Sequence, residues 1–367
     1  MCYNSVDVFR LHFFSGEITM LRNHIKSAIL LISAAALVSC SEPAPMASVS
    51  DNVPHNRDVF AMDTYMSMKA YGSNSEAALD EAEKFITQLE NDLSVTNENS
   101  CISKVNSASG SPVTITDDAA EIISKALEIG KNTNGALDIT IYPLLKEWGF
   151  TTGDNKIPKQ LVLDTLMADM GFEKVHLDGD TVTIPENFLI DLGALAKGYT
   201  SDKIMKIMKK NGVDSAIVSL GGNVQAMGAK PDGSLWKVSV RDPFMPDTDM
   251  CIIETDTKAV ITSGNYERYF VGSDGKNYWH ILDPADGYPA DNGLVSVTII
   301  GDSGLECDAL STALFVLGDG KAQEYWKAHH DFDMILVTDD GKIIYTDGIA
   351  DRFTNISSME AEVLCLD

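Results

Sequence analysis

The sequence predicts an α+β protein in which mixed or antiparallel sheets pack against helices. Segments with the apolar spacing of helices and segments with the short alternation of strands follow one another in blocks. These blocks do not alternate regularly, as the βαβ units of a parallel sheet do. The 367 residues are 44% hydrophobic and 22% charged, which is typical of globular proteins and excludes collagen, coiled coils and wholesale disorder.

The individual elements follow from these periods in chain order. Helical spacing predicts helices at 75–91, 117–134, 158–170, from 194 onward, 305–317 and 320–329. Pro158 opens the third helix, because proline is tolerated in the first helical turn. Strands are predicted at 64–71, in a hairpin at 173–178 and 181–184, in short segments between 214 and 300, and in a closing hairpin that turns at 339–341.

The N-terminal residues have the pattern of an export signal. Residues 29–38 form an apolar run behind the basic residues Arg22 and Lys26, and the run is too short to span a bilayer as a stable helix. It ends in the sequence LVSC at Cys40, which resembles the bacterial lipobox, whose cysteine is lipidated and becomes the new N-terminus. An ordinary signal peptide and a buried helix are the alternatives, and Met20 is an alternative start.

Three regions are expected from this N-terminal pattern. Because residues 41–57 are rich in Pro and Ser and lack periodicity, they favour a flexible tether. No linker interrupts the residues that follow. We therefore expect a lipoprotein signal peptide over 1–39, a tether over 40–57 with a lipidated Cys40, and one catalytic domain over 58–367.

Charge, cysteines and missing motifs exclude several functions. The formal net charge of −26 repels phosphate backbones, so we expect no nucleic-acid partner. The chain has no phosphate-loop motif, no GxSxG elbow, no HExxH motif and no strand-linked GxGxxG. Beyond the N-terminal region the cysteines are too widely spaced for a zinc site, and we expect buried free thiols, with pairing as the alternative in an exported protein. They are Cys101, Cys251, Cys307 and Cys365.

Two segments carry residues suited to phosphate and metal chemistry. Asp191 leads a Gly-rich turn into a helix that carries Lys197 in its opening turns, and a helix N-terminus with a Lys is a site for a pyrophosphate. Asp308 and Thr312 lie four residues apart on one helical face, so a carboxylate and a hydroxyl together form a hard-oxygen pair suited to Mg²⁺. Taken alone, a plain helix start and an ordinary cap with a helical Thr explain the same residues.

His280 is the histidine that lies within a dense polar and Gly-rich motif, which makes it a candidate acid or base at neutral pH. A strand histidine bonded to Asp283 or to the backbone is the alternative. The motif is one of several that place Gly, Asp, Thr or Lys beside apolar strand residues. These segments are GALDIT at 135–140 with WGF at 148–150, IDLGALAKG at 190–198, SLGGN at 219–223, TSGNY at 262–266, HILDPADG at 280–287 and CDALSTA at 307–313.

In this order, behind a lipobox, the segments resemble the ApbE family of FAD:protein FMN transferases, from about Met62 to Gly318. The resemblance implies an ApbE-like flavin transferase fold with FAD as substrate and Mg²⁺ as metal. The implied flavin and FAD contacts are Met62, Ala136, Leu137, Asp138, Asp191, Lys197, His280 and Ile281. The implied metal ligands are Asp308, Thr312 and the backbone carbonyl of Ala194, and His280 and Asp308 are the implied catalytic residues.

The reaction that the resemblance implies is Mg²⁺-dependent transfer of FMN from FAD to a Thr or Ser hydroxyl of an acceptor protein, with release of AMP. Two alternatives share most of the motifs. One is an Mg²⁺-dependent FAD pyrophosphatase that uses water, and the other is a non-catalytic flavin-binding lipoprotein, against which the retained Asp308 and Thr312 argue. The expected partners are acceptor flavoproteins of membrane or exported redox systems. The expected location is the cell envelope, through a lipid anchor facing the periplasm or exterior.

Overall fold

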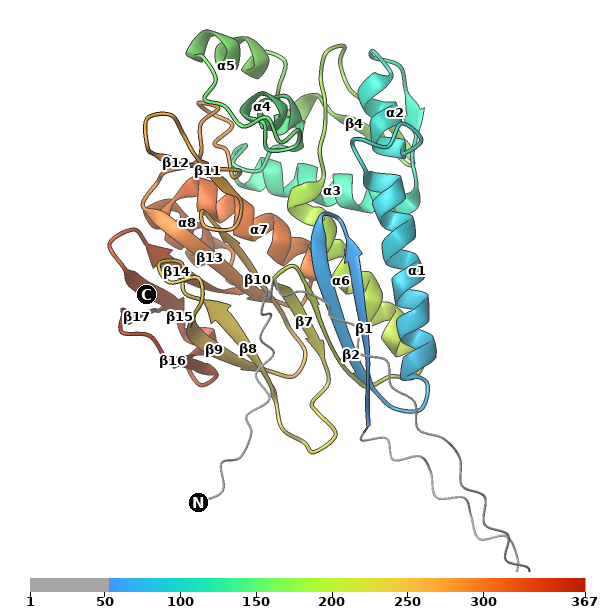
Figure 1. Cartoon of the computed structure of the whole chain (residues 1–367), viewed down its shortest axis with the longest axis vertical. Coiled ribbons are helices and arrows are strands. Elements are labelled where there is room, and N and C mark those ends of the chain that lie inside the picture. Colours follow the sequence, from blue (N-terminus) through green and yellow to red (C-terminus); the bar gives the residue numbers. More distant parts are fainter. Residues whose placement is uncertain (1–52, 367) are drawn as a thin grey trace, which may run out of the picture.

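The computed structural model describes residues 53–366, whose main feature is a nine-stranded sheet with helices on one face and a smaller sheet on the other (Figure 1). Neighbouring strands of the large sheet are antiparallel except β15 and β17, which are parallel. Its order is β1 (Pro54–Ala61), β2 (Thr64–Tyr71), β6 (Ser215–Leu220), β7 (Asn223–Met227), β10 (Ala259–Gly264), β13 (Leu294–Gly301), β14 (Asp333–Thr338), β15 (Lys342–Thr346) and β17 (Glu360–Leu364).

Eight α-helices and three smaller sheets complete the part of the chain that the structure describes. The helices are α1 (Ser75–Leu93), α2 (Cys101–Ser107), α3 (Asp117–Asn132), α4 (Tyr142–Trp148), α5 (Gln160–Met167), α6 (Gly193–Lys210), α7 (Gly304–Leu317) and α8 (Asp319–Ala328). The small sheets join β8 (Trp236–Arg241), β9 (Asp249–Thr255) and β16 (Phe353–Asn355); β3 (Val113–Thr114), β5 (Thr181–Thr183) and β4 (His176–Asp178); and β11 (Tyr269–Val271) with β12 (Asn277–Trp279).

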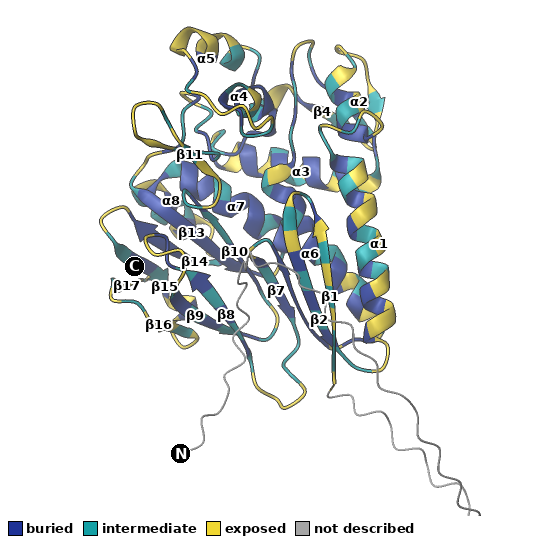
Figure 2. Ribbon diagram, in the orientation of Figure 1, coloured by how far each residue is buried: buried dark blue, intermediate teal, exposed yellow. Residues whose placement is uncertain are grey.

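The large sheet is buried on both faces at its centre. In β6, Ala216 and Val218 pack among side chains of α1 and α6, whereas Ile217 between them packs among side chains of β8 and β9. Because successive side chains of a strand point to opposite faces, a strand covered on both sides contains only buried residues, as β6 does. Figure 2 shows these central strands in the colour of buried residues, with exposed residues on the edge strand β1 and the outer side of α1.

Helices α6 and α7 cross closely because glycine lies at the contact. A Cβ atom on Gly198 would lie 2.1 Å from the carbonyl oxygen of Gly304 and 2.6 Å from Cβ of Asp308. A Cβ atom on Gly304 would in turn lie 2.5 Å from the carbonyl oxygen of Gly198. Any larger side chain at either position would therefore push the two helices apart.

The predicted elements are largely confirmed, but strands β3, β16 and β17 were not predicted, so the hairpin at 339–341 does not close the chain, and four further corrections apply. Helix α5 begins at Gln160, because Lys159 is extended and forms its N-cap, so Pro158 lies before the helix. The strand predicted at 173–178 is shortened to β4, because residues 172–174 form a 3₁₀ turn. The short helices α2 and α4 were not predicted, since seven residues give little periodicity. Strand β1 begins at Pro54, so the last residues assigned to the tether belong to the sheet.

Two further expectations concern cysteines and membranes. Cys101, Cys251 and Cys307 are free and buried as predicted, but the free thiol of Cys365 is exposed, because it follows the edge strand β17. Within residues 53–366, no helix combines the length and the apolar character needed to cross a bilayer. The predicted signal peptide and Cys40 lie outside the described residues.

Candidate active site

The first turns of α6 form the centre of the candidate site. Asp191 precedes the helix, and its Oδ1 accepts a hydrogen bond from the N–H of Gly193 at 2.8 Å. Its own N–H donates to the carbonyl of Ile139 at 2.9 Å, which ties the helix start to the segment around residues 136–138. Burial raises the pKa of Asp191, and the Gly193 N–H together with the charges of Arg268 and Lys197 opposes that rise.

Asp308 reaches this centre from α7. Its side chain is 3% exposed, and its two oxygens accept hydrogen bonds from the Gly198 N–H and from Nδ2 of Asn223, both at 2.8 Å. Burial raises the pKa of Asp308, and the charge of Lys197 is the largest influence that opposes the rise. In a regular α-helix the Gly198 N–H points at the carbonyl of Ala194. Because Asp308 accepts from that N–H, its carboxylate lies against the turn of α6 that contains Ala194.

A group of hydroxyls lies one helical turn beyond Asp308. Oγ of Ser263 on β10 lies 2.8 Å from Oγ of Ser311 and 3.3 Å from Oγ1 of Thr312. Ser311 is fully buried and also donates to the carbonyl of Asp308 at 2.9 Å, which leaves the half-buried Thr312 as the more accessible hydroxyl. The described residues contain no cluster of three or more His, Cys, Asp or Glu side chains that could hold a metal. A metal at this position would therefore be bound by one carboxylate with hydroxyl and carbonyl oxygens.

His280 lies directly after β12 and is held by the residue that precedes β11. Both its N–H and its ring Nδ1 contact the carbonyl oxygen of Arg268, at 3.1 and 3.2 Å. Because a carbonyl can only accept, Nδ1 carries the proton and Nε2 keeps its lone pair. The ring of Phe150 packs edge-on against the imidazole at 6.4 Å between centroids. Burial, and then the charges of Arg268 and Lys197, lower the pKa of His280 to about 4.

Met62 lies in the turn between β1 and β2. Met62 and Asp63 both have positive φ, at 50° and 57°, which is the backbone of a two-residue type I′ hairpin turn. The Met62 N–H donates to Oε1 of Glu90 at 2.7 Å, and its sulfur lies 3.8 Å from the hydroxyl of Thr200 on α6. The turn predicted to contact the flavin therefore packs against α6, the helix that carries Lys197 and that Asp191 precedes.

The side chain of Asp138 is bonded within the protein. Its Oδ1 accepts from the N–H and the hydroxyl of Thr140 at 2.8 and 2.6 Å, and its Oδ2 accepts from the N–H of Phe172 at 3.1 Å. Leu137 is buried in the core, whereas Ala136 is half-buried. A flavin contact through the Asp138 side chain would thus compete with these three internal hydrogen bonds. The backbone of residues 136–138 is therefore better placed than that side chain to contact the flavin. Ile281 is likewise buried, at 5% exposure.

Arg268 is a site residue that the sequence reasoning missed. Its charge acts on both Asp191 and His280, and its Nη2 donates to the carbonyl of Phe150 at 2.9 Å. The β11–β12 hairpin pairs Tyr269 with Trp279, so Arg268 and His280 form the next pair in the same register. The dipeptide Asp274-Gly275 is typical of a hairpin turn and could have predicted this pairing from the sequence. The sequence analysis, however, predicted only short strands between 214 and 300 and did not assign this hairpin.

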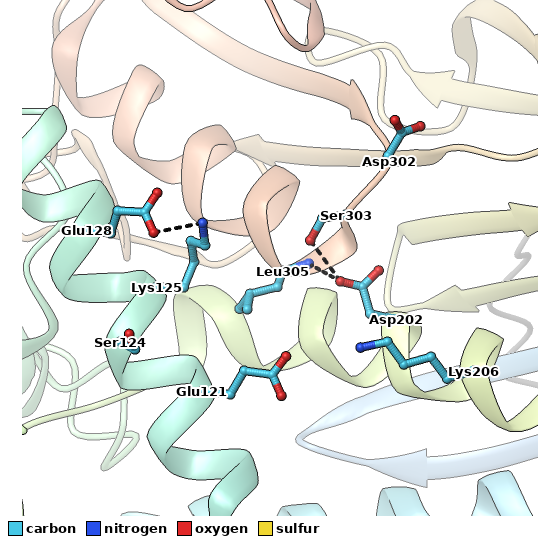
Figure 3. Close-up of a pocket in the computed structure, with 9 residues that line it drawn as sticks. All are labelled: Glu121, Ser124, Lys125, Glu128, Asp202, Lys206, Asp302, Ser303 and Leu305. Atoms are coloured by element: carbon cyan, nitrogen blue, oxygen red, sulfur yellow. Dashed lines mark hydrogen bonds and ion pairs between the residues drawn. The ribbon is translucent and has the colours of Figure 1, made fainter. Parts of the chain in front are cut away.

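A surface cavity of about 430 Å³ lies apart from these residues, between α3, α6 and the start of α7 (Figure 3). None of the predicted site residues lines it. Within it, Asp202 of α6 accepts hydrogen bonds from the Ser303 hydroxyl and from the N–H groups of Gly304 and Leu305, at 2.7–3.0 Å. The cavity wall thus includes the capped N-terminus of the helix that carries Asp308.

Comparison with known proteins identifies the fold and the family. The sequence profile of the ApbE family matches residues 62–336, three quarters of the chain. This chain belongs to the ApbE family.

Its ApbE-family relatives include curated FAD:protein FMN transferases and solved structures. The transferases of Escherichia coli strain K12 and Klebsiella pneumoniae strain 342 are 30% and 32% identical, with alignments covering 80% and 84% of this chain and 87% and 97% of those proteins. The crystal structure of the ApbE protein of Thermotoga maritima matches with a TM-score of 0.77 at 30% identity, over 82% of this chain and 99% of that one. The flavin transferase ApbE of Vibrio cholerae matches with 0.75 at 25% identity, over 82% and 99%.

These relatives confirm the predicted family, the α+β ApbE-like fold and the expectation of a transferase enzyme. The structure also connects the predicted site segments through the first half of α6. Met62 contacts Thr200, Asp191 is bonded to Ile139 directly after the 136–138 segment, and Asp308 is bonded to Gly198. The ligand and catalytic roles assigned to individual residues stay predictions.

Proposed function

We propose that this ApbE-family protein transfers FMN from FAD to a Thr or Ser hydroxyl of an acceptor protein, in an Mg²⁺-dependent reaction that releases AMP. One observation carries the proposal. A buried carboxylate, Asp308, and a neutral imidazole, His280, both lie within the electrostatic reach of the same lysine, Lys197, in the opening turns of α6. Phosphoryl transfer needs a cation, a metal ligand and a base around the phosphoryl group that is transferred, and Lys197, Asp308 and His280 can fill these three roles.

The residues present fit Mg²⁺. This ion prefers oxygen ligands and keeps several waters or substrate phosphates as its other ligands. The fit rests on the chemistry of the donor set: the Asp308 carboxylate, which has more lone pairs than its backbone donors Gly198 and Lys197 and the Asn223 amide use, the Thr312 hydroxyl one turn along the same helix, and the Ala194 carbonyl at the start of α6. When bound here, Mg²⁺ would neutralise charge on the pyrophosphate oxygens.

The other residues perform the remaining tasks. The Lys197 ammonium binds and orients the pyrophosphate at the start of α6, where the helix dipole also favours an anion. The type I′ turn at Met62 and the backbone of residues 136–138 flank the flavin. His280 Nε2 accepts the proton of the acceptor hydroxyl, whose oxygen bonds to the FMN-side phosphorus. The bond from that phosphorus to the bridging oxygen breaks, and AMP leaves with that oxygen.

The test is incubation with FAD, Mg²⁺ and a candidate acceptor, followed by a denaturing gel viewed for flavin fluorescence. A phosphoester to Thr survives denaturation, so the acceptor band should fluoresce and AMP should appear in equal amount. Replacing the acceptor Thr with Val keeps the size and removes the hydroxyl, which makes it the matched control. If FAD is cleaved equally fast with and without acceptor and no band fluoresces, the enzyme is a pyrophosphatase. If FAD binds but is never cleaved, it is a flavin-binding protein.

We also propose that the enzyme is a lipoprotein, anchored through Cys40 in the cell envelope and acting on flavoprotein acceptors of membrane or exported redox systems. The support is the lipobox at residues 37–40 and the Pro- and Ser-rich segment that precedes β1 at Pro54. Changing Cys40 to Ala should yield a soluble protein or an uncleaved precursor. A native protein that fractionates with the cytosol and retains Met1 would contradict the anchor without affecting the proposed chemistry.

A further inference from the structure

Arg268 contacts the surroundings of His280 in two separate ways. Through its backbone, the carbonyl oxygen accepts from Nδ1 of the imidazole at 3.2 Å and fixes the tautomer. Through its side chain, Nη2 donates to the carbonyl of Phe150 at 2.9 Å, across 118 residues of chain, and the Phe150 ring packs edge-on against the same imidazole. The guanidinium therefore joins the base of the β11–β12 hairpin to the segment that follows α4.

The position of Arg268 also matters for charge. The charged groups that act on the imidazole are Arg268 from the hairpin and Lys197 from α6, and the same two cations act on Asp191 in the loop before α6. Arg268 is exposed as a residue, whereas His280 is half-buried. Two cations beside a partly desolvated imidazole disfavour its protonated form.

We propose that Arg268 is a positioning residue, which holds His280 in the orientation and the neutral form in which Nε2 accepts the proton of the acceptor hydroxyl. This inference rests on the proposed function, because it assigns to His280 the role of base. The side chain acts through two separable properties. The hydrogen bond to Phe150 fixes the ring that packs on the imidazole, and the positive charge keeps the imidazole neutral at lower pH.

Three substitutions separate these properties. Arg268→Lys keeps the charge, Arg268→Gln removes the charge but keeps a donor for the Phe150 carbonyl, and Arg268→Met removes both. Arg352→Met is the matched control, because Arg352 is an exposed arginine whose guanidinium pairs with Asp256 at 3.3 Å, next to the separate sheet that contains β9. Melting temperatures of all four variants show which of them fold normally.

The first readout is the pH profile of kcat/KM for FMN transfer, whose acid limb reports the free enzyme's base. We expect the limb to move upward by roughly one pH unit in Arg268→Gln and Arg268→Met, and to stay in place in Arg268→Lys and Arg352→Met. The plateau should fall about tenfold or more in Arg268→Met alone, through kcat rather than KM, because only that variant loses both properties. A purely structural role would lower the rate by one factor at every pH and leave the limb unmoved.

The second readout needs no turnover, so it separates failure of this inference from failure of the proposed function. Titration of ¹⁵N-histidine-labelled protein without FAD should show one histidine, absent in His280→Gln, that stays neutral to about pH 4 with its proton on Nδ1. In Arg268→Gln its midpoint should rise by about one pH unit, because burial still lowers the pKa of His280. An unchanged midpoint, or identical behaviour of Arg268→Lys and Arg268→Met, would overturn the inference even if the enzyme transfers FMN.

Discussion

Asp308→Asn is the substitution that tests the centre of the site most directly. The carboxylate accepts from the Gly198 N–H and the Asn223 amide, each at 2.8 Å, and also from the backbone N–H of Lys197. An Asn side chain offers one oxygen and one NH₂ group, so at least one of these donors must face another N–H. A buried donor left unpaired costs about 1–3 kcal/mol, which is the loss of stability we expect. Asn is uncharged, so the variant no longer pays the cost of burying a carboxylate, and this offsets part of the loss of stability.

The expected loss of activity is much larger than the loss of stability. Asp308→Asn keeps the shape of the side chain but removes the one carboxylate proposed to bind the metal. Charge stabilisation by a metal contributes several kcal/mol to such a transition state. A loss of about 4 kcal/mol corresponds to roughly a thousandfold in rate. The transfer rate at saturating Mg²⁺ and a thermal melt of the same samples measure both effects.

The matched control is Asp302→Asn, which changes an acid just before the same helix. Its side chain is 86% exposed and pairs with Lys258, so both stability and rate should stay close to wild type. Transfer by Asp308→Asn at the wild-type rate in Mg²⁺ would refute the metal assignment. Equal Mg²⁺ affinity of the two variants, measured by calorimetry without FAD, would refute it independently.

Two further predictions concern pH and the helix crossing. Because the pKa of His280 is lowered to about 4, the acid limb of kcat/KM should lie near pH 4 and not near 6.5. The free energy of unfolding should also fall as the pH drops from 6.5 toward 4, because in this range the histidine takes up a proton only in the unfolded state. Activity and urea denaturation of wild type and His280→Gln across pH 4–8 measure both. Gly198→Ala should destabilise the fold by about 1–3 kcal/mol and reduce transfer, because its Cβ would meet the Gly304 carbonyl at 2.1 Å. Gly320→Ala in α8, whose Cβ would meet nothing within 4 Å, should be neutral or stabilising by up to about 1 kcal/mol in the same melts.

Each of these predictions has an outcome that contradicts it. If the acid limb of kcat/KM lies near pH 6.5 in both the wild-type enzyme and Arg268→Gln, His280 is not the group whose titration limits the rate. Equal melting temperatures for Gly198→Ala and Gly320→Ala would mean that α6 and α7 can separate without cost. In that case the close approach at Gly198 would not be what places Asp308.

The secondary structure could be predicted wherever a periodic apolar pattern continues over a long segment. Helices α1, α3 and α6 have the apolar spacing expected of them, and each buries those residues against the sheet or a neighbouring helix. The short helix α2 was missed because its start depends on a local cap, in which the Ser100 hydroxyl accepts from the Ser103 N–H at 2.8 Å. Strand β1 was missed because it is an edge strand with alternating exposed residues and a Pro- and Ser-rich segment before it.

The candidate site divides in the same way. Asp308 and Thr312 could be placed on one helix from their spacing, and both lie in α7. Arg268 could not, because its relation to His280 depends on the register of a hairpin and its relation to Phe150 on a contact across 118 residues. The internal bonding of Asp138 was equally hidden, since Phe172 approaches it from a distant part of the chain.

Helices α6 and α7 each supply a carboxylate to the main chain of the other. Asp202 of α6 accepts from the N–H groups of Gly304 and Leu305 at the start of α7, and Asp308 of α7 accepts from the N–H of Gly198 in α6. The two glycines let the helices approach closely enough for both sets of bonds. These bonds fix the orientation of the Asp308 carboxylate through groups of the protein itself. Binding a metal would then add a ligand to an oriented carboxylate and would require little rearrangement of the helices, which is the preorganisation that electrostatic catalysis needs.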